Sequence, residues 1–490
     1  MIIGANGGQL ELLSKNQLYE IHMASLDVLE KVGMFFESSE VLKLLEDAGA
    51  YVDYKTKIAK IPRYLVEEAV RKAPKSIMLC GRNPKYDVRL EGKRVYIAGA
   101  SGGVYVLDFD RKRRPGTLKD LEKITRLEDY LENVHVVPTA IVPQDVPKLG
   151  LYTKAYEIIV ENTEKHAFHE AENMNDLKTQ LKMAATVVGG EDELRKRPII
   201  SYINCLVSPL KANKRFLEIL TGCAKFGVPV SIETDPQMGG LSPVTLIGTM
   251  IQINAEVLGG ITLAQLINPG TPVIYAHAAT TMGLQAKSIG ACEGAPERGL
   301  LHVATAQLTR YYGIPSCCVA PTTDSKSIDV QNGYEKALTF LMTALAGINL
   351  IHSGIGMIDS CITVSYEQFV TDNELAGMVF RIIRGIEIPE GSIEESLDVI
   401  SKVGPLGSHY LSQKHTKKYL KIEHWIPEVT VRGGWELWME AGAKNTRELA
   451  KEKAEKIIAE HYPEPLPKET KEEIKRIIKE AFKNPNSYNH

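Results

Sequence analysis

Polar side chains that could bind a ligand or transfer a proton gather in residues 317–374, in turns that separate apolar runs. Asp324 and Gln331 belong to one polar turn, and His352 directly follows an apolar run and precedes a Ser-Gly-Ile-Gly segment. Turns of this kind are where a rigid α/β scaffold presents its chemistry. We therefore predict that Asp324, Gln331 and His352 are catalytic.

Short β-rich runs separated by helical segments must position these residues. Eight such runs occur, about 30 to 45 residues apart, as expected of repeated βα units. They are Val95–Ala98, Val134–Pro138, His166–Glu170, Ile199–Asn204, Val228–Glu233, Pro272–His277, Ser316–Ala320 and Asn349–Ser353. Eight consecutive units favour a (β/α)₈ barrel over an open sheet, and the carboxyl ends of the strands would then meet at one mouth.

Helical patterns flank the predicted barrel on both sides. Apolar positions recur at helical spacing through the first seventy-odd residues and again after Arg384. We predict an N-terminal helical cap over residues 1–76, an α/β (β/α)₈ TIM barrel over 77–385 and a C-terminal helical extension over 386–490.

Composition is that of a cytoplasmic enzyme. The net charge is -3, from 58 basic and 61 acidic residues, so nucleic acid is a poor candidate partner. Seven scattered cysteines without a CxxC pair predict reduced thiols, and the first residues lack the pattern of a signal peptide. A charge-poor region, 236–286, is interrupted by prolines, which favours a barrel core or a subunit interface over a membrane span. A homo-oligomer is therefore expected.

The motifs resemble those of the trimethylamine methyltransferase (MttB-type) superfamily. The resemblance rests on the polar block 322–335, on Asn349–Gly356 and Ser365–Glu367, and on Met238–Thr245, Gly294–Glu297 and Tyr311–Pro315. It implies the barrel fold and an enzyme of methanogenesis or one-carbon metabolism that moves a methyl group from a methylated amine to the cobalt of a corrinoid (cobalamin). This chain has no D-x-H-x-x-G cobalamin-ligand motif, so a small partner protein is expected to carry the corrinoid.

The leaving group narrows the substrate class. The trimethylamine-specific members contain pyrrolysine, whereas this sequence contains only standard residues. A quaternary ammonium leaves as a neutral amine without such activation, so the chain resembles the glycine betaine:corrinoid methyltransferases. Glycine betaine is the leading candidate, and a trimethylamine-specific enzyme is an alternative.

Recognition of a quaternary ammonium requires aromatic faces and carboxylates, because this cation has no N–H to donate. The predicted rings are those of Tyr96, Tyr202, Tyr275 and Tyr334, with Glu233 or Asp324 as the balancing charge. A betaine carboxylate also needs a donor, for which Arg310 and His352 are candidates. The predicted substrate-binding set is Tyr96, His169, Tyr202, Glu233, Tyr275, His277, Arg310 and Tyr334.

Other functions fit parts of the sequence. Gly99–Gly103 matches the nucleophile elbow of serine hydrolases, but the next residues predict a strand where that motif requires a helix, so we expect a hairpin turn. His166 and His169 cannot share a strand face. A zinc-dependent corrinoid methyltransferase using His169, Cys318 or His352 is a further alternative, although the main hypothesis needs no directly bound metal. A non-catalytic betaine-binding barrel is the alternative outside catalysis.

Overall fold

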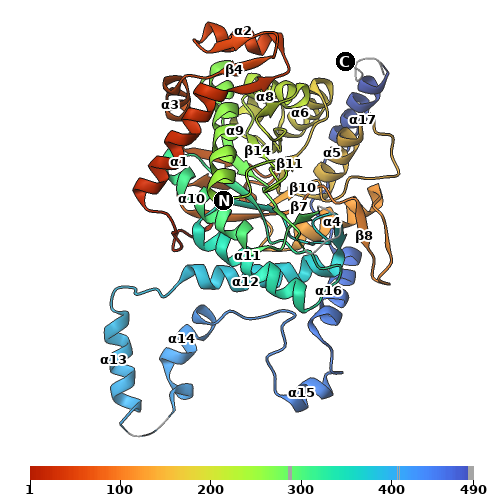
Figure 1. Ribbon diagram of the computed structural model, residues 1–490. Coiled ribbons are helices and arrows are strands. Elements are labelled where there is room, and N and C mark those ends of the chain that lie inside the picture. The colour runs from red at the N-terminus through yellow and green to blue at the C-terminus, as the bar shows by residue number, and fades with distance from the viewer. Residues whose placement is uncertain (285–289, 406, 408, 484–490) are drawn as a thin grey trace.

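Eight parallel strands close into a barrel in the computed structural model, which describes residues 1–284, 290–405, 407 and 409–483 (Figure 1). The strand order is β7-β10-β11-β12-β14-β15-β18-β19, and β19 pairs back with β7. The strands are β7 (Arg94–Ala100), β10 (Val136–Pro138), β11 (His166–His169), β12 (Ile200–Tyr202), β14 (Val230–Thr234), β15 (Val273–His277), β18 (Ser316–Ala320) and β19 (Leu350–Ser353). Each of the eight predicted runs overlaps a barrel strand, which confirms the predicted (β/α)₈ fold.

A helix follows each barrel strand and packs outside it. These helices are α4 (Leu118–Tyr130), α5 (Leu151–Asn162), α6 (Met174–Val188), α8 (Lys214–Phe226), α9 (Leu246–Ile267), α10 (Pro296–Tyr312), α11 (Val330–Ala346) and α12 (Tyr366–Arg384); the short α7 (Glu191–Lys196) follows α6. Side chains that accept from first-turn N–H groups cap several of them: Thr117, Asn173, Asn213, Thr245 and Asp329.

One compact apolar cluster fills the barrel interior. It is built from alternate residues of the strands, such as Phe168, Ile274, Ala276, Cys317 and Leu350. Because side chains alternate along a strand, the intervening residues face the helices. This alternation decides which polar residues can reach the mouth.

The N-terminal segment contains a small sheet as well as the predicted helices. The elements before the barrel are β1 (Ala5–Asn6), α1 (Lys15–Asp27), the π-helix η1 (Val28–Val32), β2 (Met34–Phe36), α2 (Ser39–Asp47), β3 (Tyr51–Asp53), β4 (Ile58–Lys60), α3 (Arg63–Lys72), β5 (Ser76–Leu79), η2 (Pro84–Tyr86) and β6 (Val88–Glu91). Strands β2, β3 and β4 form a sheet with β13 (Lys211–Ala212), and β5 pairs with β6. Strand β1 pairs with the first residues of β7 and marks the amino end of the barrel.

The charge-poor region is largely the interior of this chain. Helix α9 is long and apolar enough to cross a membrane by length and composition, but 72% of its most apolar window is buried in the protein. It packs against α1, α3 and barrel strand β14. The described part of this region, 236–284, is therefore mainly core, which was one of the two predicted alternatives; residues 285 and 286 lie outside the described residues. Its lack of charge is no argument for a subunit interface.

Additional strands cover the carboxyl end of the barrel. The strands β20 (Met357–Ile358), β21 (Thr363–Ser365), β8 (Tyr105–Leu107) and β9 (Arg113–Pro115) form one sheet, and β16 (Thr281–Met282) pairs with β17 (Ala291–Cys292). The strand predicted after Gly99–Gly103 is β8, but the predicted hairpin is wrong. Strand β8 pairs instead with the nearby β9 and with the distant β21.

The C-terminal extension is helical, as predicted, but only part of it packs on the barrel. It contains α13 (Ser392–Val403), η3 (Tyr410–Ser412), α14 (Lys414–Glu423), α15 (Trp435–Glu440), α16 (Thr446–Glu460) and α17 (Lys468–Phe482). Helix α16 packs against α12 and α4, and α17 against α6. Helices α13, α14 and α15 project away from the barrel (Figure 1).

Candidate active site

Glu233 lies near the carboxyl end of β14 and points into the barrel. The preceding residue, Ile232, is adjacent to Gly260 of the outer helix α9. Neighbouring side chains of a strand face opposite sides, so Glu233 faces the interior. The residue is 3% exposed, and Oε2 has no hydrogen-bond partner among the described residues. A buried carboxyl oxygen without a partner is costly unless a ligand completes it.

His352 of β19 meets Glu233 inside the barrel. The two side chains approach to 3.6 Å between Nε2 of His352 and Oε1 of Glu233. The imidazole also packs edge-on against Phe168 of β11, with ring centroids 5.6 Å apart. Nδ1 lies 2.8 Å from Oγ of Ser353, whereas Nε2 has no hydrogen bond within the described chain. The carboxyl group, the imidazole and an aromatic ring thus share one small region.

Burial makes both titratable groups neutral near pH 7. The pKa of Glu233 is raised to about 8, first by burial and then by the nearby carboxylates of Asp235 and Glu170, which outweigh the lowering effect of Arg298. Burial also lowers the pKa of His352 to about 3, assisted by the positive charge of Arg298. A cation bound at this position would favour the ionised form of Glu233.

Several more acidic groups surround the pair. Glu170 follows β11 and accepts a hydrogen bond of 3.1 Å from Arg215. Glu293 precedes α10 and forms a buried ion pair with Arg298. Burial raises the pKa of Glu293 to about 7, although Arg298 opposes the shift. Four carboxyl groups near two arginines, counting Glu233 and Asp235, give the mouth acidic character.

Two exposed residues adjoin the buried Glu233. The backbone of β12 continues past its end alongside β14, since the N–H of Glu233 donates to the carbonyl of Asn204 at 3.0 Å. Cys205 is bridged to Glu233 in this extension, and its side chain is exposed. The side chain of Asp235 is exposed as well. Glu233 is therefore buried but lies directly beside solvent-exposed residues at the carboxyl end of the barrel.

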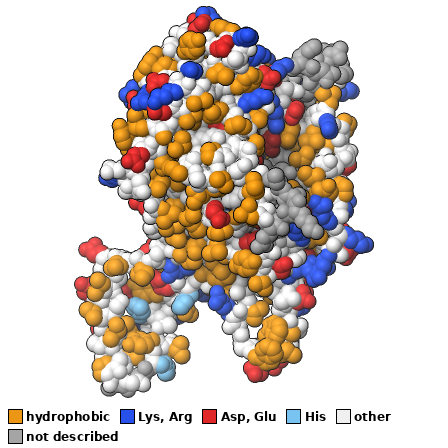
Figure 2. All heavy atoms as spheres, in the orientation of Figure 1, with side chains coloured by type: hydrophobic (Ala, Val, Ile, Leu, Met, Phe, Trp, Pro, Cys, Tyr) orange, Lys and Arg blue, Asp and Glu red, His pale blue; other side chains and the backbone are white. Residues whose placement is uncertain are grey.

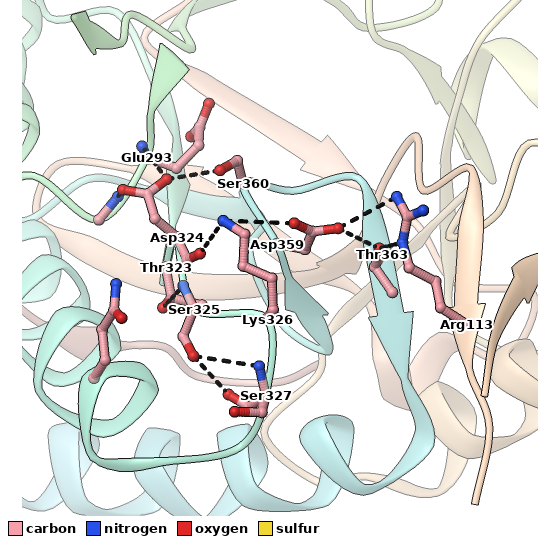
Figure 3. A network of polar contacts seen from close by, with 12 residues as sticks. Arg113, Glu293, Thr323, Asp324, Ser325, Lys326, Ser327, Asp359, Ser360 and Thr363 are labelled. Carbon is pink, nitrogen blue, oxygen red and sulfur yellow. Dashed lines mark hydrogen bonds and ion pairs between the residues drawn. The ribbon is translucent and has the colours of Figure 1, made fainter. Parts of the chain in front are cut away.

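Asp324 holds together the loops at the rim (Figure 3). Its carboxylate accepts hydrogen bonds from the N–H groups of Glu293 and Gly294 at 2.9 and 3.0 Å and from Oγ of Ser360 at 2.8 Å. Burial would raise the pKa of Asp324, but hydrogen bonds from Cys292 and these groups outweigh it and lower the pKa. With its oxygens engaged in this way, Asp324 acts as a positioning residue for the mouth.

The loop after β20 has an unusual backbone. Asp359, Ser360 and Cys361 have φ angles of 56°, 54° and 62°, a region that non-glycine residues seldom occupy. The N–H groups of Asp359 and Ser360 donate to the carbonyls of Ser325 and Thr323 at 2.7 and 3.0 Å. Figure 3 shows Asp359 between the side chains of Lys326 and Arg113. Strain held by surrounding contacts is common at functional sites.

The tyrosines predicted to bind the ammonium do not converge. Tyr202 faces the outer helices and packs in the cluster that includes Cys223, and Tyr275 donates to Asn254 of α9 at 3.1 Å. Tyr96 lies in the interior but at the amino end, where its hydroxyl donates to the carbonyl of Ile2. Tyr334 is 53% exposed on α11. Strand alternation and position along the barrel axis separate these rings, so the expected cage is not formed.

The other predicted residues also lie away from the Glu233–His352 pair. Both ring nitrogens of His169 are engaged, by Thr139 and by the carbonyl of Tyr152. Arg310, at the end of α10, donates to the carbonyl of Ala346 at the amino end of the barrel. Gln331 is on α11, where Nε2 donates to Glu335 at 2.9 Å. Gln331 lies near the rim, whereas His169 ends β11 with its side chain facing outward and Arg310 lies at the opposite end.

A candidate metal centre lies outside the barrel wall. Ligand atoms of His277, His302 and Cys318 are all within 4.8 Å of one another and buried. Nδ1 of His277 accepts from the N–H of Ala279 at 3.2 Å, which places the proton of the neutral ring on Nε2. His277 would have to change tautomer to bind a metal through Nε2. His169 and His352, the other residues considered for zinc, do not belong to this cluster.

Sequence reasoning missed several residues of the mouth. Glu170 and Asp235 follow barrel strands, and Arg298 follows the Gly-Ala-Pro-Glu motif. Their positions after strand ends could have identified them, since such residues converge in a barrel. Phe168 carries no comparable signal, because an apolar residue in a strand is usually core.

The sequence of the whole chain matches known methyltransferases. The family described as Trimethylamine methyltransferase (MTTB) matches residues 2–483. The chain belongs to the trimethylamine methyltransferase (MTTB) family. Trimethylamine methyltransferase MttB of Desulfitobacterium hafniense (strain DSM 10664 / DCB-2) is 39% identical, covering 96% of this chain and 93% of the relative. The glycine betaine methyltransferase of D. hafniense (strain Y51) is 33% identical, covering 96% of this chain and 97% of the relative.

A solved structure supports the fold of this MTTB-family methyltransferase. The monomethylamine methyltransferase (MtmB) of Methanosarcina barkeri superposes with a TM-score of 0.52, covering 91% of this chain and 88% of MtmB. Its sequence identity is 10%, so the likeness concerns the barrel architecture alone.

Proposed function

We propose that this chain transfers a methyl group from a quaternary amine, with glycine betaine the best candidate, to the Co(I) centre of a corrinoid carried by a small partner protein. The setting would be one-carbon metabolism in the cytoplasm. The observation that carries the proposal is the buried carboxyl group of Glu233, whose Oε2 has no hydrogen-bond partner among the described residues and which lies next to His352 and Phe168 in an acidic mouth.

The electrostatics of the mouth suit a permanent cation. A trimethylammonium group cannot donate an N–H hydrogen bond, and its attraction to carboxylates and ring faces is non-directional. Asp235 and Glu170 supply negative charge beside Glu233, and Phe168 supplies a ring. A cation near Glu233 would convert the neutral carboxyl group to a carboxylate.

Two features favour a betaine over trimethylamine. The chain contains only standard residues, so it has no pyrrolysine to activate a tertiary amine. One relative at 33% identity is named a glycine betaine methyltransferase. The carboxylate of a betaine would need a donor, for which His352 and Arg298 lie near Glu233, whereas the predicted donor Arg310 lies at the opposite end.

The residues of the mouth would bind and orient the substrate and exclude water. The partner's cobalt, when present, supplies the nucleophile that accepts the methyl group. Glu233 would hold the ammonium, and His352 would limit its orientation so that one methyl group faces outward. Asp324 and the turn 359–361 would keep the rim in shape for the partner.

Anaerobic methyl transfer to Co(I) cobalamin tests the proposal, with conversion to methylcobalamin followed by its visible spectrum. We expect turnover with glycine betaine and none with trimethylamine. Glu233→Gln and His352→Ala should lower turnover by about 30- to 1,000-fold, because each removes one partner of a buried polar contact. Arg310→Ala is the control and should retain activity. Equal activity of all variants, with intact folding, would refute the assigned roles.

Two alternatives are distinguished by the same preparation. The observation that favours a zinc-dependent enzyme is the cluster of His277, His302 and Cys318. Stoichiometric zinc in the purified protein would support this alternative. Betaine binding without turnover, even with an active cognate corrinoid protein, would indicate a binding protein.

A further inference from the structure

An apolar surface covers the lobe formed by α13 and α14, defined here as the described residues between 386 and 426. The lobe projects from the barrel beyond the end of α12 (Figure 1). Figure 2 shows hydrophobic side chains over its surface. Ten large apolar side chains in it are between 40% and 93% exposed: Ile386, Ile388, Ile393, Leu397, Ile400, Tyr410, Leu411, Leu420, Ile422 and Ile426.

Helix α13 has two apolar stripes, and only one is packed. Val399 and Val403 are buried within the lobe. Ile393, Leu397 and Ile400 follow the helical spacing i, i+4, i+7 and are 57%, 61% and 51% exposed. Such a stripe is the usual packing face of a helix. A helix that is apolar on two sides is normally covered on both.

We propose that this lobe is the contact surface for a second copy of this chain, with the exposed stripe of α13 at its centre. The inference goes beyond the proposed function and does not depend on it. In a symmetric dimer the same surface of each copy meets the other, so it must be self-complementary.

The charges of the lobe meet this requirement. Helix α13 carries Glu394, Glu395 and Asp398 against one lysine, a net charge of -2. Helix α14 carries four lysines against one glutamate, a net charge of +3 without its histidine. Glu395 of α13 already pairs with Lys418 of α14 at 3.0 Å within one copy. The acidic helix of one copy can likewise face the basic helix of the other.

The position of the lobe disfavours the corrinoid partner as its occupant. The lobe begins after the carboxyl end of α12, where the carbonyl of Ile383 accepts from Gln9. This point lies beside β1, which pairs with the first residues of β7 at the amino end of the barrel. Glu233 and His352 face the other end. A protein docked over the mouth would leave the α13–α14 lobe uncovered.

The apolar area of the lobe reaches the lower limit for a specific dimer interface. Fully burying one Leu or Ile side chain contributes about 1.5–3 kcal/mol. At about 25 cal/mol per Å² of apolar surface, this corresponds to roughly 60–120 Å² for each side chain. The ten partly exposed side chains therefore offer on the order of 600 Å² per copy. Two copies together reach about 1,200 Å², the lower limit for specific interfaces.

Sedimentation velocity of the full-length protein tests the proposal. The wild type should sediment as a dimer or a larger assembly in the micromolar range. The double variant Leu397→Glu/Ile400→Glu should raise the dissociation constant at least about 100-fold, with an unchanged far-ultraviolet circular dichroism spectrum. The matched control Val32→Glu/Tyr51→Glu adds two charges at exposed apolar positions of the N-terminal segment and should leave the assembly intact.

Two outcomes would overturn the proposal. One is a monomeric wild type throughout the micromolar range. If binding of such a monomer to a corrinoid protein were lost in the double variant, the occupant of the lobe would be that partner. The other is a double variant that associates as tightly as the control.

Discussion

Binding of a quaternary amine should depend steeply on pH through Glu233. The pKa of this group is raised to about 8 by burial and by neighbouring carboxylates, so it is protonated at neutral pH when no cation is bound. The cation favours the carboxylate, and the proton must therefore leave on binding. Affinity for glycine betaine should rise as pH rises from about 6 to about 8, by about tenfold or 1.36 kcal/mol per pH unit, and level off above that.

Isothermal titration calorimetry measures this linkage without any methyl transfer. Titrations in buffers with different ionisation enthalpies report the protons released on binding. At pH 7, a group with a pKa near 8 is about nine-tenths protonated, so about 0.9 proton should be released per betaine bound. The titration needs neither cobalt nor the partner, so its result is independent of catalysis.

Substitution separates Glu233 from other titrating groups. Glu233→Gln should abolish the proton release and flatten the pH dependence, while weakening binding at pH 8. Arg310→Ala, at the other end of the barrel, should keep the wild-type slope. A wild-type affinity that is constant between pH 6 and 8, or a Glu233→Gln variant that releases the same fraction of a proton, would refute the reasoning.

Three further predictions concern stability. Because the folded-state pKa of Glu233 is raised, its stabilising contribution is present below about pH 4.5 and is lost as pH rises through about 8. Above pH 8, Glu233→Gln should therefore have a higher free energy of unfolding than wild type, by up to about 5 kcal/mol, in denaturant titrations. A difference that is constant at all pH values would contradict this. Lys336 and Asp372 form a buried ion pair of 2.7 Å. Asp372→Ala should lower the free energy of unfolding by about 3–5 kcal/mol in denaturant titrations, and replacement of both residues by apolar ones should lower it much less. Equal losses for the two variants would count against the pairing. A Cβ on Gly354 would lie 2.2 Å from the carbonyl oxygen of Pro321. Gly354→Ala should therefore lower the free energy of unfolding by about 1–3 kcal/mol and lower the melting temperature. An unchanged melting temperature would show that the loop after β19 shifts to accommodate the methyl group.

The barrel was predictable because its signal is repeated. Each of the eight β-rich runs is weak alone, but their regular spacing with intervening helices leaves few alternatives. The strand predicted after Gly99–Gly103 also formed as β8, yet one of its two partners, β21, lies more than 250 residues further along the chain. Local pattern identifies a strand and does not identify its partner.

The mouth was only partly predictable. Glu233 and His352 stand at strand ends, and convergence in a barrel brings them together. Tyr202 and Tyr275 stand at similar positions but face the helices. The strands of a closed parallel barrel are buried on both faces, so their sequences lack the polar alternation that would reveal which residues point inward.

The sequence by itself determined the barrel, its order of strands and helices, and the family to which the chain belongs, because these depend on local periodicity and on motifs that can be read in order. The tertiary structure alone decided which way each strand-end side chain faces, that Asp324 braces the rim, and that α13 presents an uncovered stripe. These properties depend on the phase of each strand, on contacts between loops far apart in sequence, and on which helix faces are buried by neighbours. None of them is encoded in a short window of residues.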